Sequence, residues 1–90
     1  MKKLINKHIL EHQVTLNSVA NLDESIIKVA NLLIECLEHG GTIFWCGNGG
    51  SASDSQHLAG ELVGRFVGDR KPLKSIALTA DSAVMTCIVN

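Results

Sequence analysis

The chain has 90 residues, of which 46% are hydrophobic and 19% are charged, and its formal net charge is −1 at pH 7. A chain of this length allows one small domain at most, and its near-neutral charge gives no reason to expect nucleic acid or a membrane as partner. The sequence has no apolar run near the roughly 20 residues that span a bilayer, and polar residues interrupt any signal-peptide core, so we expect a cytoplasmic protein.

Two helices are predicted in the first 39 residues. Apolar residues recur at helical spacing from about Lys2 to Val19, and the break over Ser18–Asp23 supplies capping residues. A second helix is expected over Asp23–Glu38, ended by Gly40 and Gly41 in the left-handed conformation. Its buried stripe is predicted to consist of Ile26, Ile27, Ala30, Leu33, Ile34 and Leu37.

The remaining residues alternate between predicted strands and helices. A strand is predicted at Thr42–Cys46, a helix from about Ala52 to Phe66, and a second strand, buried on both faces, at Ser75–Leu78. A last helix follows from Ser82 to about Ile88, with Thr79 and Asp81 as candidate caps. This alternation predicts an α/β fold with parallel strands and right-handed crossovers. Because two strands do not make a stable doubly wound sheet, we expect the complete fold to need further strands.

The polar side chains outside the central motif are assigned structural roles. Cys36, Cys46 and Cys87 are expected to be buried reduced thiols, because they are odd in number and lack CxxC spacing. Asp54 is expected to cap the third helix, and residues 69–71 are expected to form a charged surface loop. The histidines outside the motif are expected to face solvent or to cap a helix end: His8, His12 and His39.

The most informative stretch is residues 46–61, where the first strand stops at a Gly/Asn/Ser cluster and a helix begins. The cluster consists of Gly47, Asn48, Gly49, Gly50 and Ser51, with Ser51 or Ser53 as the predicted N-cap. Glycine permits positive φ and close approach of a ligand, and the helix start directs N–H groups and a positive dipole end into the turn. The spacing matches neither a P-loop nor GxGxxG, so an anion site and an ordinary strand-to-helix turn both remain open.

His57 and Glu61 are four residues apart and share one face of the predicted helix, in line with Arg65. The two side chains could share a metal such as Zn²⁺, or Glu61 could take a proton from a carbon next to a carbonyl. The alternative is a solvated helix face with a weak His–Glu–Arg ladder. The position behind the carboxyl end of a parallel strand, where such folds bind ligands, favours a functional role.

Two runs of the sequence resemble bacterial phosphoheptose isomerases of the sugar isomerase (SIS) domain superfamily: CGNGGSASDSQHLAGELVGRF, and PLKSIALTAD with the terminal Asn90. The resemblance implies the N-terminal half of a SIS-type, flavodoxin-like parallel sheet with flanking helices. Residues 1–39 would be N-terminal helices and residues 42–90 the first βαβα portion of a partial SIS domain. It also implies conversion of D-sedoheptulose 7-phosphate to D-glycero-D-manno-heptose 7-phosphate, a precursor of ADP- or GDP-heptose and lipopolysaccharide. The resemblance implies that the enzyme is a cytoplasmic homotetramer that uses zinc.

The resemblance also implies roles for individual residues. Glu61 matches the catalytic carboxylate, and His57 and Glu61 match two zinc ligands. The family's second half would supply the phosphate loop and the remaining ligands, so we expect the 90-residue chain to be inactive alone and marginally stable or dependent on association. The positions that match substrate contacts are Asn48, Gly49, Gly50, Ser51, Glu61, Arg65 and Asn90.

Two other functions are weighed against an isomerase. The first is a non-catalytic SIS-domain protein that binds a phosphosugar or a replication initiator protein; such relatives typically lack a carboxylate at the position of Glu61. The second is a sugar-phosphate sensor that binds its ligand without reaction. The presence of Glu61 favours the enzyme.

Overall fold

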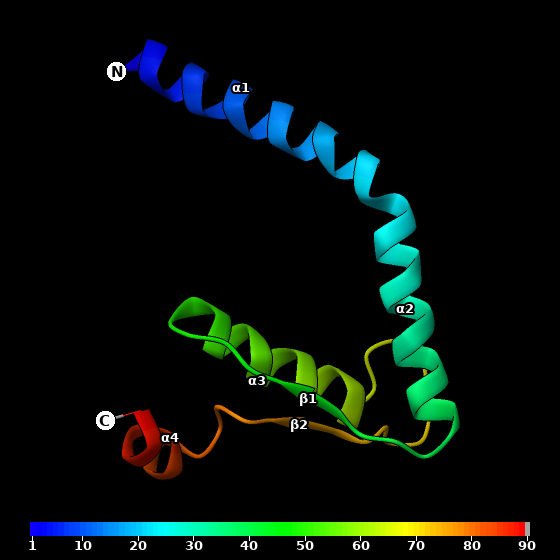
Figure 1. Cartoon of the computed structure of the whole chain (residues 1–90). Coiled ribbons are helices and arrows are strands. Elements are labelled where there is room, and N and C mark those ends of the chain that lie inside the picture. The colour runs from blue at the N-terminus through cyan, green and yellow to red at the C-terminus, as the bar shows by residue number, and fades with distance from the viewer. Residues whose placement is uncertain (90) are drawn as a thin grey trace. The chain divides into compact units, whose positions relative to one another are not determined.

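The computed structural model describes residues 1–89, and the predicted substrate contact Asn90 lies outside this part. The chain divides into two compact units, Met1–Leu32 and the residues from Leu33 onward, and each is described by itself. Figure 1 gives the order of the helices and strands along the chain. Over residues 1–89, none of the helices combines the length and apolar character that crossing a membrane requires.

The first unit is helical. Helix α1 (Lys2–Ser18) leads into a 3₁₀ segment, η1 (Val19–Leu22), and then into the first half of α2 (Asp23–Glu38), as Figure 1 shows. These bounds confirm both predicted helices and the break between them. The carboxylate Oδ1 of Asp23, the first residue of α2, accepts a hydrogen bond from the N–H of the adjacent Glu24 at 2.7 Å.

The predicted buried stripe of α2 is wrong for the described residues. Ile26 is 52% exposed and Ile27 is 58% exposed, and no residue of the helix is fully buried. An apolar stripe is buried only when another element packs on it, and sequence periodicity cannot supply that element. The helix ends as predicted at Gly40, whose φ is +77°, whereas Gly41 does not adopt positive φ.

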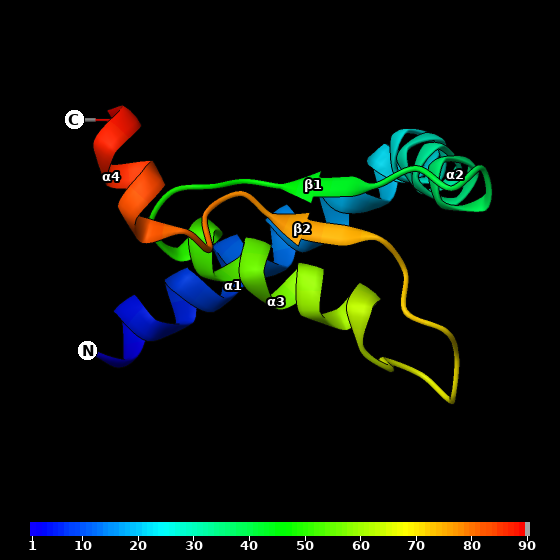
Figure 2. The same ribbon diagram turned by 90° about the horizontal axis from the view of Figure 1, so that it is seen from below.

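The second unit contains a parallel pair of strands, β1 (Ile43–Trp45) and β2 (Ser75–Ala77). Ile43 pairs with Ser75 and Trp45 with Ala77, and the indole Nε1 of Trp45 donates to Oγ of Ser75 at 2.8 Å. Both strands are predicted correctly in place and are shorter than predicted. Figure 2 shows them side by side, with the same direction.

Helix α3 (Gly50–Val63) packs against this strand pair and encloses a small core (Figure 2). The buried apolar residues of this core are Ile43 from β1, Ala59 from α3 and Ala77 from β2. Ile76, between the buried Ser75 and Ala77, is 50% exposed, so the prediction that β2 is buried on both faces is wrong here. Burial of both faces of a parallel sheet requires helices on both sides.

Helix α4 (Ser82–Val89) follows β2, and its predicted cap is confirmed: Oδ1 of Asp81 accepts from the N–H of Val84 at 3.1 Å. The three cysteines are free thiols, as predicted, but Cys46 and Cys87 are exposed and only Cys36 is half-buried. The predicted burial is therefore wrong for two of them, because their apolar sequence neighbours do not form an enclosing layer in the described chain.

Candidate functional site

The glycine-rich turn connects the end of β1 to the start of α3. Gly49 is the N-cap, with φ +55° and ψ −123°, and no side chain caps the helix. The helix starts two residues earlier than predicted, so Ser51, Ser53 and Asp54 lie inside it and the predicted capping roles are wrong. Backbone bonds close the turn instead: Ser51 N–H donates to Asn48 at 2.9 Å and Ala52 N–H to Gly49 at 3.1 Å.

This turn is tightly packed on one side and open on the other. A Cβ added to Gly47 would lie 2.6 Å from the carbonyl oxygen of Ser51, so the close approach of these two segments requires glycine. Nothing lies within 4 Å of a Cβ placed on Gly49 or Gly50. The backbone of Asn48, Gly49 and Gly50 is thus in an exposed position that a ligand can reach.

His57 and Glu61 lie on successive turns of α3, about two and three turns after Gly50. Nε2 of the imidazole is 3.1 Å from Oε1 of the carboxylate, which confirms that the two side chains share one helix face. The His57 side chain is 76% exposed and that of Glu61 is 32% exposed. The carboxylate therefore has limited contact with water and an imidazole as its neighbour, an arrangement that suits proton transfer or metal binding.

The two side chains also fit the predicted zinc ion as a partial ligand set. Imidazole nitrogen and carboxylate oxygen are usual zinc donors, and two ligand atoms of a tetrahedral zinc lie about 3.3 Å apart at normal bond lengths. The observed 3.1 Å between Nε2 of His57 and Oε1 of Glu61 is close to that spacing. Among residues 1–89, no three His, Cys, Asp or Glu side chains are grouped so that they could hold a metal, so further ligands would be needed.

The predicted alignment of Arg65 with His57 and Glu61 is wrong. Helix α3 ends at Val63, and Gly64 takes an extended conformation, so the helical spacing does not continue to Arg65. Nη1 of Arg65 instead donates to Oδ1 of Asp69 at 2.8 Å, and both side chains are largely exposed. The guanidinium thus belongs to the turn after α3 and is paired with a carboxylate there.

Arg70 is the residue that sequence analysis missed. The sequence predicted Arg70 to be part of a charged surface loop. In the structure its side chain is half-buried, and it donates to the carbonyl oxygens of Glu61 at 2.6 Å and Leu62 at 2.7 Å, at the end of α3. An arginine close after a helix can bind the last carbonyls, and this is the signal that could have suggested it. The donor lies eight and nine positions after its two acceptors in the sequence, so local patterns do not reveal the contact.

The turn after β2 is attached to the first half of α3. Nε2 of Gln56 donates to the carbonyl of Thr79 at 3.4 Å, and the hydroxyl of Thr79 donates to the carbonyl of Ala52 at 3.3 Å. Thr79 therefore contacts α3 rather than capping α4 as predicted. These bonds attach the helix that bears His57 to the turn at the carboxyl end of β2.

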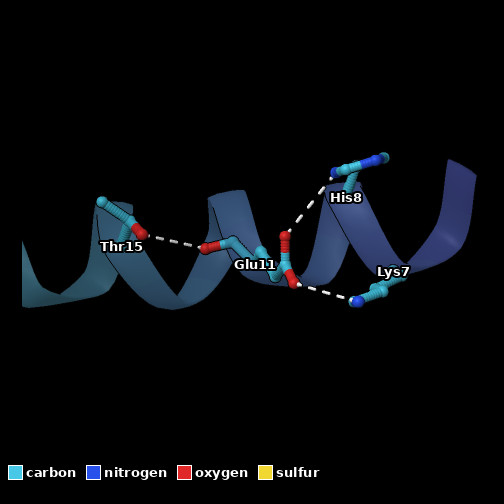
Figure 3. A network of polar contacts seen from close by, with 4 residues as sticks. All are labelled: Lys7, His8, Glu11 and Thr15. Carbon is cyan, nitrogen blue, oxygen red and sulfur yellow. Dashed lines mark hydrogen bonds and ion pairs between the residues drawn. The ribbon is translucent and has the colours of Figure 1, made fainter. Parts of the chain in front are cut away.

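The other histidines have the structural roles expected of them. His8 is exposed on α1, where its Nδ1 lies 3.6 Å from Oε2 of Glu11 and Lys7 Nζ lies 3.9 Å from Oε1 (Figure 3). The carbonyl of Glu11 accepts from the Thr15 hydroxyl at 3.0 Å. At the end of α2, Nδ1 of His39 bonds to the carbonyl of Glu35 at 2.8 Å.

Comparisons with known proteins extend over nearly the whole chain. The model of the SIS domain family matches residues 9–90. Phosphoheptose isomerase 1 of Campylobacter jejuni is 48% identical over 90 residues, which are 100% of this chain and 48% of the relative. Phosphoheptose isomerase of Helicobacter pylori strain P12 is 48% identical over 88 residues, covering 97% of this chain and 46% of the relative. The chain spans about half the length of the curated relatives it matches.

A solved structure has the same fold over nearly the whole chain. Phosphoheptose isomerase GmhA from Neisseria gonorrhoeae superposes with a TM-score of 0.78 at 34% identity, covering 97% of this chain and 45% of that one. The small parallel sheet with its flanking helices therefore corresponds to part of a larger α/β domain.

Proposed function

This chain belongs to the SIS domain family, and we propose that the protein containing it is an aldose–ketose isomerase acting on a phosphorylated seven-carbon sugar. The proposed reaction converts D-sedoheptulose 7-phosphate to D-glycero-D-manno-heptose 7-phosphate. The observation that carries the proposal is the partly enclosed carboxylate of Glu61 beside the imidazole of His57, two to three turns behind an open glycine turn. The names of relatives 48% identical to the chain support the choice of substrate.

In the proposed reaction, Glu61 acts as the general base. Its carboxylate takes a proton from the carbon next to the substrate carbonyl and returns it to the neighbouring carbon, so that the sugar passes through an enediolate. His57 lies 3.1 Å from the same carboxylate and restricts its orientation. Zinc, if held by His57, Glu61 and further ligands, would supply a Lewis acid that polarises the carbonyl oxygen.

The glycine turn is proposed to hold the substrate in register with Glu61. Backbone groups of Asn48, Gly49, Gly50 and Ser51 would contact substrate oxygen atoms, because this segment is exposed and lies at the positive end of α3. Arg65 would exchange its exposed partner Asp69 for an anionic group of the substrate. Such fixed contacts reduce the entropic cost of reaching the reactive geometry. Asn90 is proposed as a further substrate contact.

We further propose that the protein is cytoplasmic and forms a homotetramer whose product enters lipopolysaccharide precursor synthesis. The number of apolar side chains exposed along α1 supports association, since burying them would require another surface. At least half of each of the following side chains is exposed: Leu4, Ile5, Ile9, Leu10, Val14 and Leu16.

The test of this function is a Glu61→Gln variant of the complete protein, assayed for conversion of sedoheptulose 7-phosphate. We expect kcat to fall by about 10²- to 10⁴-fold, since the amide cannot accept the proton. Glu38→Gln, at an exposed position at the end of α2, is the matched control and should keep full turnover. Unchanged turnover in the Glu61 variant would remove Glu61 from the mechanism. Tight binding of the sugar phosphate by a wild type that forms no product would indicate a sensor instead.

A further inference from the structure

The last turn of α3 ends without the usual left-handed glycine. Gly64, the C-cap, is extended, with φ −84° and ψ −153°, and its N–H donates to the carbonyl of Gly60 at 2.8 Å. No basic residue lies in the last turn of the helix itself. The carbonyls of Glu61 and Leu62 therefore have to find partners outside the helix, as the final carbonyls of any helix must.

Arg70 supplies those partners. Its Nη2 donates to the carbonyl of Glu61 at 2.6 Å, and its Nη1 donates to the carbonyl of Leu62 at 2.7 Å. The backbone N–H of Leu73 adds a bond to the carbonyl of Leu62 at 3.0 Å. A guanidinium at this end of a helix also interacts favourably with the negative end of the helix dipole. The side chain is half-buried, which limits competition from water.

This contact matters for function because Glu61 lies within the turn that Arg70 closes. Helix ends fray readily, and fraying of this last turn would move Glu61 away from His57. We propose that Arg70 is a positioning residue: it holds the backbone of Glu61, and so places the carboxylate against His57 and the substrate. This inference rests on the proposed isomerase function. Arg70 contacts the Glu61 backbone and takes no part in the proton transfer itself.

The geometry requires an arginine rather than any cation. The planar guanidinium offers separate N–H groups in a fixed fork, and two of them reach two successive carbonyls here. Lysine would keep the charge and could bond to one carbonyl at a time. Arg70→Lys should therefore recover part of what Arg70→Gln loses.

The second unit offers a matched control. Nζ of Lys74 donates to the carbonyl of Gly40 at 3.1 Å, just after the end of α2. It is also a cation bound to backbone at a helix end, but that helix does not carry Glu61. Lys74→Gln removes a single exposed contact between a cation and a backbone carbonyl, away from α3, and should leave kcat unchanged.

The experiment compares the wild type, Arg70→Gln, Arg70→Lys, Lys74→Gln, Glu61→Gln and the Arg70/Glu61 double variant of the complete protein. Turnover is measured with sedoheptulose 7-phosphate, well below the melting temperature of each variant. We expect Arg70→Gln to lower kcat by about 10- to 100-fold, because small displacements of a reacting group are costly, with KM changed by less than about threefold. Arg70→Lys should lie between the wild type and Arg70→Gln.

The double variant distinguishes positioning from general stabilisation. If Arg70 acts through Glu61, adding Arg70→Gln to Glu61→Gln should lower kcat no further. If the two residues act independently, the fold-losses in kcat of the two single variants should multiply in the double variant. Hydrogen exchange gives a readout that needs no activity. Exchange in the peptide spanning Glu61 to Gly64 should be at least about tenfold faster in Arg70→Gln, with mid-helix exchange unchanged.

Each outcome has a distinct meaning. An active wild type whose kcat is unaffected by Arg70→Gln would overturn the positioning role while leaving the proposed function intact. Multiplying losses in the double variant would also overturn it, as would unchanged exchange at the end of α3. A wild type that isomerises no phosphorylated heptose would overturn the proposed function, and the positioning role of Arg70 in that reaction would fall with it.

Discussion

Nε2 of His57 lies 3.1 Å from Oε1 of Glu61, across one turn of α3, yet the two side chains differ in their contact with water. The imidazole is 76% exposed, whereas the carboxylate is 32% exposed. The carboxylate is therefore the more enclosed of the two side chains and has less contact with water. The exposed imidazole is accessible to contact by groups from outside residues 1–89.

The first prediction concerns zinc at this pair. His57→Ala in the complete protein should weaken zinc binding by at least about tenfold, because it removes one of the two adjacent donor atoms. Competition with a chromophoric chelator measures the affinity. His12→Ala, on the exposed surface of α1, is the control and should bind zinc like the wild type. Equal affinity in both variants would exclude His57 as a ligand.

The second prediction concerns the glycine turn. In the complete protein, Gly47→Ala should lower the free energy of unfolding by about 1–3 kcal/mol, since its Cβ would lie 2.6 Å from the carbonyl oxygen of Ser51 and force the turn to shift. Gly50→Ala has open space and should change stability little or raise it slightly. Urea unfolding of the two variants decides this. Equal stability would show that the turn adapts without cost.

The third prediction concerns the link between the strands. In the complete protein, Ser75→Ala leaves the indole N–H of Trp45 without its 2.8 Å partner, which should cost about 1–2 kcal/mol of unfolding free energy. Trp45 fluorescence should also report the change, because the indole N–H loses this hydrogen-bond partner. Ser53→Ala, at an exposed position of α3, should leave both quantities unaltered. A stable Ser75 variant would show that water replaces the hydroxyl.

The fourth prediction concerns the 90-residue polypeptide by itself. Its buried apolar residues in the described part are Ile43, Ala59 and Ala77, too small a core to offset the chain entropy of folding. We expect it to show no isomerase activity and either to associate in sedimentation experiments or to unfold without cooperativity. A monomer that unfolds cooperatively and converts sedoheptulose 7-phosphate would refute this.

Much of the local structure follows from the sequence alone. The spacing of apolar residues located α2, and the predicted left-handed end at Gly40 is confirmed by its φ of +77°. The i, i+4 spacing of His57 and Glu61 sufficed to place them on one face of α3. These features depend on bonds and side-chain directions within a few residues, so short-range rules describe them.

The tertiary structure decided the features that depend on distant segments. Some local features also differ from the prediction: α3 begins after Gly49 rather than at the serines, with Gly47 packed against Ser51, and it ends at Val63, before Arg65. The contact between Arg70 and the Glu61 carbonyl forms only once the loop after α3 folds back on the helix. The sequence pattern marks which residues are apolar or charged, but burial and long-range hydrogen bonds depend on which segments meet in space.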